Sequence, residues 1–317
     1  MPELPDIVVY AEAIDKYVVG KRLNQLRLVS PFVLRSVDPP LASITGRVVR
    51  GVHRIGKRIV LEFDGDAPGE GHDLFLVIHL MIAGRLRWRE KTPEGKRSGT
   101  RGEPKKPPAI SPRLILATFE FDTGTLFLTE ASSKKRASIR LVRGRSALGE
   151  VDPGGIEPLQ ATREEFREAL VRENHTLKRG LTSPRLVSGI GNAYSDEILH
   201  AARLSPLKLT RSLSDEEWAR LYDATHDTLN RWVQRLRDET GEGFPEKVTA
   251  FHDEMAVHGR FKHPCPVCGT PVQRIVYADN ECNYCARCQT GGRLLADRSL
   301  SRLLKDDWPR SIDEVDQ

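Results

Sequence analysis

All five cysteines of this 317-residue chain lie in one segment, residues 265–288. Four of them form two CxxC units separated by sixteen residues, Cys265 with Cys268 and Cys285 with Cys288. Two thiolate pairs at this spacing predict one closed, tetrahedral Zn²⁺ site with a β-hairpin between the pairs. Such a site is structural, and metal binding worth about 10 kcal/mol stabilises a hairpin that has no core of its own.

The fifth cysteine, Cys282, lies three residues before Cys285 and offers an alternative CxxC unit. Its surroundings lack the Cys-x-x-Cys-x-Thr ending that the other two units share. We therefore expect Cys282 to be a spare thiol within the hairpin.

The size and composition of the chain fit a soluble globular protein of two or three domains, with a hydrophobic share of 39%. No run approaches the roughly 18 apolar residues that cross a bilayer, and the acidic start differs from a signal peptide. We therefore expect a cytoplasmic protein without membrane contact, and we expect a monomer because the sequence gives no sign of an oligomer. A formal net charge of +5 permits a polyanionic partner without requiring one.

The chain contains three successive regions with different secondary-structure patterns. Residues 5–18 place apolar side chains on one helical stripe, and residues 22–150 consist of short β-rich runs that predict a β-sandwich or barrel. After a Pro/Gly-rich joint at 152–159 the sequence is helical, with capping boxes at Thr162 and Ser214. The predicted fold class is therefore α+β multidomain.

The stretch SGIGNAYSDEIL, residues 188–199, places Gly189 and Gly191 just before a helix. A turn of this kind exposes backbone N–H groups at a helix N-terminus, which is a natural cradle for a phosphate, and Asn192 adds a side-chain donor. An ordinary glycine-rich turn between two helices is the other interpretation.

A second stretch with two interpretations is the basic segment 89–108, which contains almost nothing that can be buried. It reads as a mobile, solvated insertion between strands. The alternative is a contact to nucleic acid.

Five motifs occur in the order seen in the formamidopyrimidine-DNA glycosylase/endonuclease VIII family, which the chain resembles over about residues 1–292. They are MPELPD at the start, the lysine of IGKRIVL, GIGNAYSDEIL, VHGR and the CxxC pair. The resemblance implies an N-terminal catalytic β-sandwich domain with a leading helix, a helix-two-turn-helix domain and a C-terminal β-hairpin zinc finger. The expected boundaries are 1–150, 151–255 and 256–292, with a tail at 293–317.

The activity implied by the resemblance is that of a bifunctional DNA glycosylase and AP lyase, which acts on double-stranded DNA that contains damaged, oxidised bases or abasic sites. The expected location is the cytoplasm, in association with the nucleoid. Removal of Met1 makes Pro2 a secondary amine, the implied nucleophile at C1′ of an everted nucleotide. A terminal amine titrates at about 8, whereas a lysine titrates at about 10.4, so a terminal amine is partly unprotonated at neutral pH. The resulting iminium permits β,δ-elimination of both phosphates.

The resemblance also assigns roles to residues other than Pro2. Glu3 matches the acid that protonates the sugar ring oxygen, although a plain helix-leading carboxylate looks the same. Asp6 has a supporting role in positioning, where the family usually carries Glu. Lys57, expected on a strand at the start of a core-facing row, matches the lysine that contacts the lesion and its phosphate; the alternative is a snorkelling edge lysine. His79 is a phosphate contact or a satisfied buried histidine.

Two segments depart from the family pattern. Asn280 occupies the zinc-finger position where the family commonly carries a phosphate-gripping Arg. Loss of this charge either weakens DNA binding or is covered by Arg274 or a residue elsewhere, and we expect Asn280 and Asn192 to contact DNA. The gap-filling loop of the first domain reads TEASSKKRAS at 129–138 and has no aromatic wedge, which leaves Met81 and Ile82 as candidates to fill the gap. The basic residues expected to contact DNA in this loop are Lys134, Lys135 and Arg136.

Two other functions fit the same residues. The chain is then either a catalytically altered relative that acts on abasic sites or unusual adducts, or a DNA-binding module without glycosylase activity. Intact Pro2, Glu3 and Lys57 argue against the module.

Overall fold

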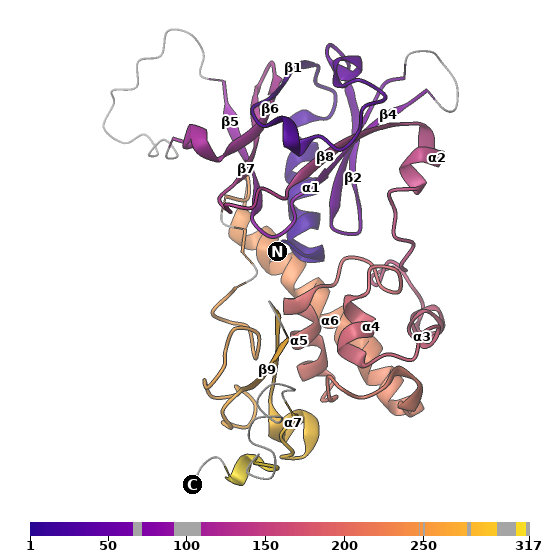
Figure 1. The fold of residues 1–317 in the computed structure, drawn as a ribbon, viewed down its shortest axis with the longest axis vertical. Helices are drawn as coiled ribbons and strands as arrows, with labels where there is room; N and C mark the ends of the chain where they lie inside the picture. The colour runs from indigo at the N-terminus through magenta and orange to yellow at the C-terminus, as the bar shows by residue number, and fades with distance from the viewer. Residues whose placement is uncertain are drawn as a thin grey trace. The chain divides into compact units, whose positions relative to one another are not determined.

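The computed structural model describes residues 1–65, 72–91, 109–246, 248–249, 251–277, 280–296 and 309–314. The chain divides into two compact units, each treated separately below (Figure 1). The N-terminal unit consists of residues 1–2, 6–152 and 237–248, and the C-terminal unit of residues 3–5, 153–236 and 249–317. The finer four-part division expected from the sequence stays a prediction.

The N-terminal unit contains two four-stranded antiparallel sheets, in the orders β1-β6-β7-β5 and β2-β3-β4-β8, which confirms the predicted β-sandwich. Alternate residues of β3 enter the main core, where Ile59, Leu61 and Phe63 are fully buried. The opposite face of the same strand presents Val60 to a smaller cluster that contains Leu148 of the short helix α2. The strands are β1 (Leu23–Leu28), β2 (Val49–Ile55), β3 (Arg58–Phe63), β4 (Leu74–His79), β5 (Gly84–Glu90), β6 (Ile115–Phe121), β7 (Gly124–Glu130) and β8 (Ser138–Arg143), and α2 is Gly144–Gly149.

Helix α1 (Leu4–Val18) packs on this core along the apolar stripe that the sequence predicts. Ile7, Ile14 and Val18 are fully buried, as their spacing along one helical face requires. The end of α6 joins the same unit, where Arg237 forms a two-pronged ion pair with Glu12 of α1.

The C-terminal unit begins with helices whose starts are fixed by their caps. The Thr162 hydroxyl accepts from Glu165 N at 3.2 Å while the Glu165 carboxylate accepts from Thr162 N at 2.8 Å. Ser214 and Glu217 repeat this reciprocal pair, so both predicted capping boxes are confirmed. The helices are α3 (Arg163–Val171), α4 (Leu177–Thr182), α5 (Asn192–Ala201) and α6 (Asp215–Thr240).

The cysteine segment folds as predicted, with an antiparallel hairpin between the two CxxC units. Its strands are β9 (Gln273–Tyr277) and β10 (Asn280–Tyr284), and α7 (Ala286–Thr290) follows. The tail contributes to the small core of this region, because Ile312 is fully buried against a cluster that includes Ile275 and Tyr284. The 3₁₀ helices of the chain's described part are Pro31–Val33, Leu41–Ile44, Pro112–Leu114, Thr210–Ser212 and Ile312–Glu314.

The first two residues of the basic segment 89–108, which was expected to form a loop, are part of a strand. Arg89 and Glu90 belong to β5, where the Arg89 guanidinium donates to Glu246 at 2.6 Å. Residues 92–108 lie outside the described residues, so the two interpretations of this segment stay open. Within the part of the chain that the structure describes, no helix has the length and apolar character needed to cross a membrane.

Candidate active site and metal centre

The carboxylate of Glu3 is held at the N-terminus of α5. Its Oε2 accepts from the backbone N–H of Gly191 at 2.7 Å and of Tyr194 at 3.2 Å, and its Oε1 accepts from Ala193 N at 3.0 Å. The first N–H groups of a helix have no partner within the helix, and the helix dipole favours an anion there. The backbone donors that the sequence suggested for a phosphate therefore hold the protein's own carboxylate, which is only 2% exposed.

Gly189 allows this approach. Its φ of +78° lies in the left-handed region, and a Cβ at this position would come within 2.9 Å of the Leu4 side chain. The Leu4 N–H donates to the Gly189 carbonyl at 2.9 Å. The glycine-rich turn thus fixes the chain on the C-terminal side of Glu3.

Pro2 directly precedes this anchored carboxylate in the chain and is buried. Its nitrogen carries Met1 in the structure, so it becomes an amine only after Met1 is removed. Asp6, 1% exposed, lies in the first turn of α1. Burial raises the pKa of the nearby Tyr10 hydroxyl, and the charge of Asp6 adds to this rise.

Lys57 does not lie on a strand, contrary to the expectation from its alternation with buried residues. It is the second residue of a two-residue turn between β2 and β3, after Gly56 with φ +57°, and Ile55 pairs with Arg58 across this turn. The alternation of buried residues predicted a strand that included Lys57, whereas β3 begins one residue later. Alternation alone does not distinguish the last residue of a tight turn from the first residue of a strand. Lys57 is half-buried at this turn.

The turn lies at one end of the sheet β2-β3-β4-β8, where other predicted residues also lie. Arg58 pairs in register with His79, and His79 pairs with Ser138, the first residue of β8. Burial lowers the pKa of His79 to about 4, and the charges of Arg58 and Lys57 contribute to this lowering, so its imidazole is neutral at pH 7. Any hydrogen bond that it donates comes from a neutral ring.

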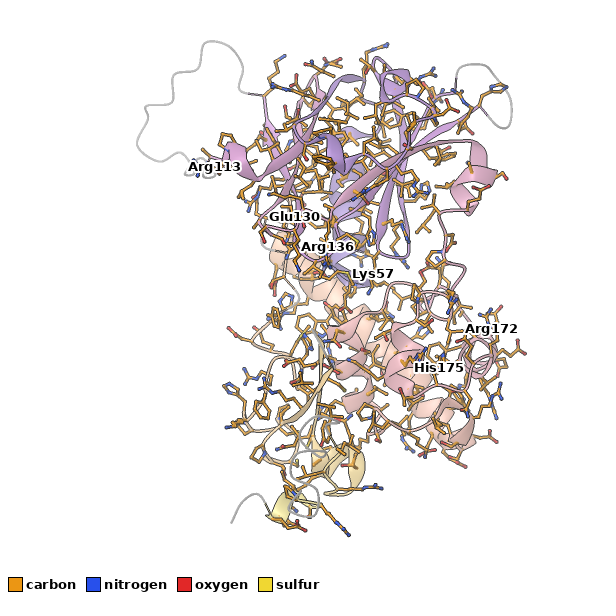
Figure 2. All side chains as sticks on the ribbon, viewed as in Figure 1. Lys57, Arg113, Glu130, Arg136, Arg172 and His175 are labelled. Atoms are coloured by element: carbon orange, nitrogen blue, oxygen red, sulfur yellow. The ribbon has the colours of Figure 1, made fainter. Side chains whose placement is uncertain are left out.

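The basic residues of the altered loop come just before β8. Lys134, Lys135 and Arg136 are exposed. The buried Glu130 closes this loop, because its Oε2 accepts from Arg136 N at 2.8 Å and from Ala137 N at 2.9 Å. Figure 2 shows Lys57, Glu130 and Arg136 at the same end of the N-terminal unit. The sequence analysis did not identify Glu130 or Arg58 as residues of this site. The one sequence signal for Arg58 is that it directly follows Lys57.

The two predicted asparagines are connected through the hairpin. The Asn192 amide donates to the Glu281 carbonyl of β10 at 2.7 Å, and Asn280 is the first residue of that strand. Contact of either residue with DNA stays a prediction.

A buried cluster of charged and polar side chains around Asp196 of α5 was not predicted from the sequence. Asp196 of α5 accepts from His258 Nδ1 at 2.8 Å and from Asn283 N at 3.1 Å, and its other oxygen contacts Lys178. Burial pushes the pKa of Asp196 upward, but Lys178 and His258 outweigh burial and hold it below the ordinary value. In SDEIL the residue reads as a solvent-facing carboxylate, so no sequence signal reveals the cluster.

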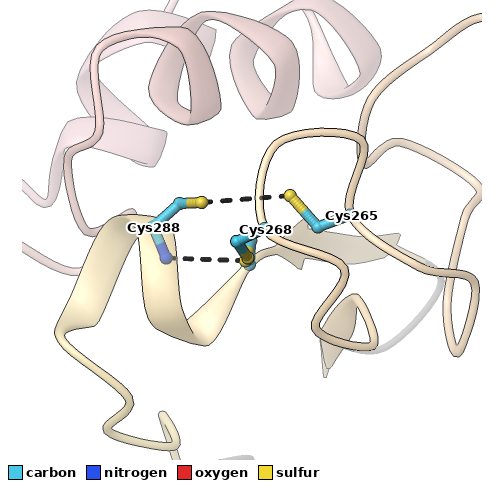
Figure 3. A group of neighbouring side chains, drawn as sticks. Cys265, Cys268 and Cys288 are labelled. Carbon is cyan, nitrogen blue, oxygen red and sulfur yellow. Dashed lines mark hydrogen bonds between the residues drawn. The ribbon is translucent and has the colours of Figure 1, made fainter.

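The four predicted cysteine ligands converge, with their sulfur atoms all within 4.8 Å of one another. Figure 3 labels three of them, Cys265, Cys268 and Cys288. The Sγ atoms of Cys265 and Cys288 are 3.9 Å apart, and those of Cys268 and Cys285 are 3.4 Å apart. Tetrahedral Zn²⁺ with Zn–S of about 2.3 Å needs S–S separations of about 3.8 Å, so the sulfur arrangement fits such an ion. Cys282 is not part of the cluster, and burial raises the pKa of its thiol.

Comparison with known proteins agrees with this architecture. The family model described as the formamidopyrimidine-DNA glycosylase N-terminal domain matches residues 1–131, and the model described as the formamidopyrimidine-DNA glycosylase H2TH domain matches residues 155–241. The fold is that of a base-excision DNA glycosylase with a helix-two-turn-helix domain. The chain belongs to the formamidopyrimidine-DNA glycosylase family.

Individual relatives cover nearly the whole chain. The formamidopyrimidine-DNA glycosylase of Symbiobacterium thermophilum is 30% identical over 91% of this chain and 89% of its own length. That of Thermus thermophilus is 31% identical over 92% of this chain and 100% of its own length. Among solved structures, a complex of Lactococcus lactis Fpg with DNA containing an abasic site matches with a TM-score of 0.72 at 24% identity, covering 91% of this chain and 99% of that chain.

We call the backbone N–H groups of Gly191, Ala193 and Tyr194 that bind the Glu3 carboxylate the Glu3 cradle. These hydrogen bonds lead to a testable prediction for stability. Glu3→Gln replaces one carboxylate oxygen by an NH₂ group that faces a backbone N–H donor, so at least one charge-assisted hydrogen bond is lost. We expect the free energy of unfolding to fall by about 1.5–3 kcal/mol, measured by denaturant titration. The matched control is Glu12→Gln on α1, the helix that begins just after Glu3; it breaks an exposed ion pair worth at most about 1 kcal/mol. Equal losses in the two variants would contradict the cradle.

Proposed function

We propose that this glycosylase excises damaged, mainly oxidised, bases from double-stranded DNA and then cleaves the strand, with Pro2 as the nucleophile. The observation that carries the proposal is the anchoring of Glu3: three backbone donors fix the residue next to Pro2 at one end of α5. A nucleophile at a chain terminus is mobile by default, and catalysis requires it to be positioned. The Glu3 anchor and the Gly189 turn supply that positioning.

The chemistry proposed for Pro2 starts from its free secondary amine. The nitrogen lone pair attacks C1′ of an everted nucleotide and the damaged base departs, while Glu3 protonates the ring oxygen so that the sugar opens. A secondary amine bonded to this carbon gives a cationic iminium, which acidifies the C2′ proton. Loss of that proton expels the 3′ phosphate, and a second elimination expels the 5′ phosphate. Asp6, in the first turn of α1, is proposed to support the position of Pro2.

DNA binding is proposed for the basic end of the sheet in the N-terminal unit. Lys57 and Arg58 at the β2–β3 turn supply charge to phosphates, and the neutral His79 ring supplies a hydrogen bond. The exposed basic residues of the loop before β8 extend this surface. In the C-terminal unit the proposed DNA contacts are Asn192 and Asn280. These interactions with DNA would place the protein at the nucleoid in the cytoplasm.

Zn²⁺ is the ion that we propose for the cysteine centre. Four thiolates in a tetrahedral arrangement favour it, and a closed set of four cysteines leaves no position for substrate or water. The ion is therefore assigned to the fold of the hairpin and to no step of the reaction. The division into domains at 150, 255 and 292 is proposed on the same family pattern.

A narrower substrate range is the second candidate. The loop closed by Glu130 offers no aromatic side chain to fill the gap that an everted base leaves, and three of its exposed residues, Lys134, Lys135 and Arg136, are cationic. A protein with such a loop suits abasic sites or unusual adducts, where no intact base has to be discriminated.

One experiment tests both candidates. Duplexes that carry 8-oxoguanine, formamidopyrimidine, an oxidised pyrimidine or an abasic site are incubated with the protein, with and without borohydride. Release of an oxidised base together with a trapped covalent adduct is the expected result. An adduct with abasic DNA alone would favour the narrower enzyme, and DNA binding without any adduct would leave only the binding module.

A further inference from the structure

Helix α5 contacts the cysteine segment and the residues before it, 256–288, through three buried polar side chains. Asp196 binds His258 and the β10 strand, and Glu197 accepts from the backbone N–H groups of residues 256–258 at 2.8–3.0 Å. The third side chain, His200, lies in the last turn of α5, and its Nε2 is 3.3 Å from the Sγ of Cys265. His200 is 6% exposed and Cys265 is 2% exposed, so this contact lies away from solvent.

A buried thiolate needs a donor. Four thiolates around a divalent ion carry a net charge of −2, and sulfur atoms that water cannot reach depend on protein N–H groups to offset it. Cys268 is exposed and has hydrogen bonds with Thr270, and Cys285 Sγ accepts from Cys288 N at 3.5 Å. Among the described residues, His200 supplies the ring nitrogen at Cys265.

The direction of this hydrogen bond follows from the ligand chemistry. A metal-bound thiolate has no proton, so it can only accept, and the ring nitrogen that faces it must carry the hydrogen. Outer-sphere donors of this kind orient a ligand and strengthen metal binding, and their removal typically costs about 10–100-fold in affinity.

We propose that His200 donates its Nε2–H to the Cys265 thiolate and thereby sets the metal affinity of the centre and locks it to α5. The inference rests on the proposed Zn²⁺ site. The locked helix is the one whose N-terminus holds Glu3, so the metal centre and the Glu3 cradle are attached to opposite ends of one rigid element.

The first test compares zinc affinities, measured by competition with a chromophoric chelator. We expect His200→Leu to bind zinc about 10–100-fold more weakly than the unaltered chain, and His200→Gln, whose amide can donate, to recover most of the loss. The matched control is His226→Leu on α6, which removes a histidine of the same unit that is not a member of the cysteine cluster. A folded His200→Leu with zinc affinity within about threefold of the unaltered chain would overturn the proposal.

The second test needs no substitution. In the unaltered chain loaded with ¹¹³Cd²⁺, the hydrogen bond predicts a scalar coupling between the His200 ring N–H proton and the metal, transmitted through the Cys265 sulfur. A folded, cadmium-loaded protein without this coupling would refute the inference even if His200→Leu failed to fold. If the unaltered chain bound neither zinc nor cadmium, the proposed metal site itself would be wrong.

Discussion

Blocking the nitrogen of Pro2 is expected to abolish covalent trapping on abasic DNA. An uncleavable N-terminal extension converts this nitrogen into an amide but leaves every side chain unchanged. An amide lone pair is delocalised into the carbonyl and does not attack C1′, so we expect the rate of borohydride-trapped adduct formation to fall by roughly 10³–10⁶-fold. The measurement is the band of cross-linked protein on a denaturing gel over time.

The control for this prediction carries the same extension after Gln317. It adds equal mass at the other end of the chain, and trapping should match that of the unaltered protein. Undiminished trapping by the blocked protein would move the nucleophile to a lysine, with Lys57 as the first candidate. The pH dependence would then separate the two amines, because a lysine titrates at about 10.4 and a terminal amine at about 8.

Glu3 and Pro2 also show where sequence reasoning reaches its limit. The helix at the start of the chain and the turn at Gly189 are local patterns, and both were predictable. That the N–H groups of Gly191 and Tyr194 bind Glu3 was not, because the partners are far apart in the sequence and any anion satisfies the same donors. A local sequence pattern shows which backbone N–H groups lack a partner within the helix. The tertiary fold determines which acceptor binds them.

The strands of the sandwich and the cysteine ligands were predictable for a different reason. Period-two alternation and CxxC spacing each encode geometry within a few residues. Lys57 was misplaced because alternation does not mark the boundary between a strand and a tight turn. Asp196 and His200 escaped notice because burial of a polar side chain depends on partners from other elements, and nothing in a helix's own letters records them.

Loss of the metal is expected to unfold the hairpin while the sandwich persists. Cys285→Ser removes a fully buried ligand, and the hairpin's remaining core is a small cluster around Ile275 and Tyr284. Metal binding worth about 10 kcal/mol is then unavailable to a segment with so little apolar surface. We expect hydrogen-exchange protection of the β9 and β10 amides to disappear, with the amides of β3 and β4 still protected.

The control for metal loss is Cys282→Ala, which removes a buried thiol of the same hairpin that lies outside the cluster. A small cavity costs about 1 kcal/mol, so this variant should still bind one metal ion and keep the hairpin protected. If Cys285→Ser lost its metal but kept protection in β9 and β10, the apolar cluster with the buried tail residue Ile312 would suffice to fold the hairpin. The metal would then stabilise only the two CxxC turns. The hydrogen bond from His200 would attach α5 to Cys265 but would not contribute to the stability of the hairpin.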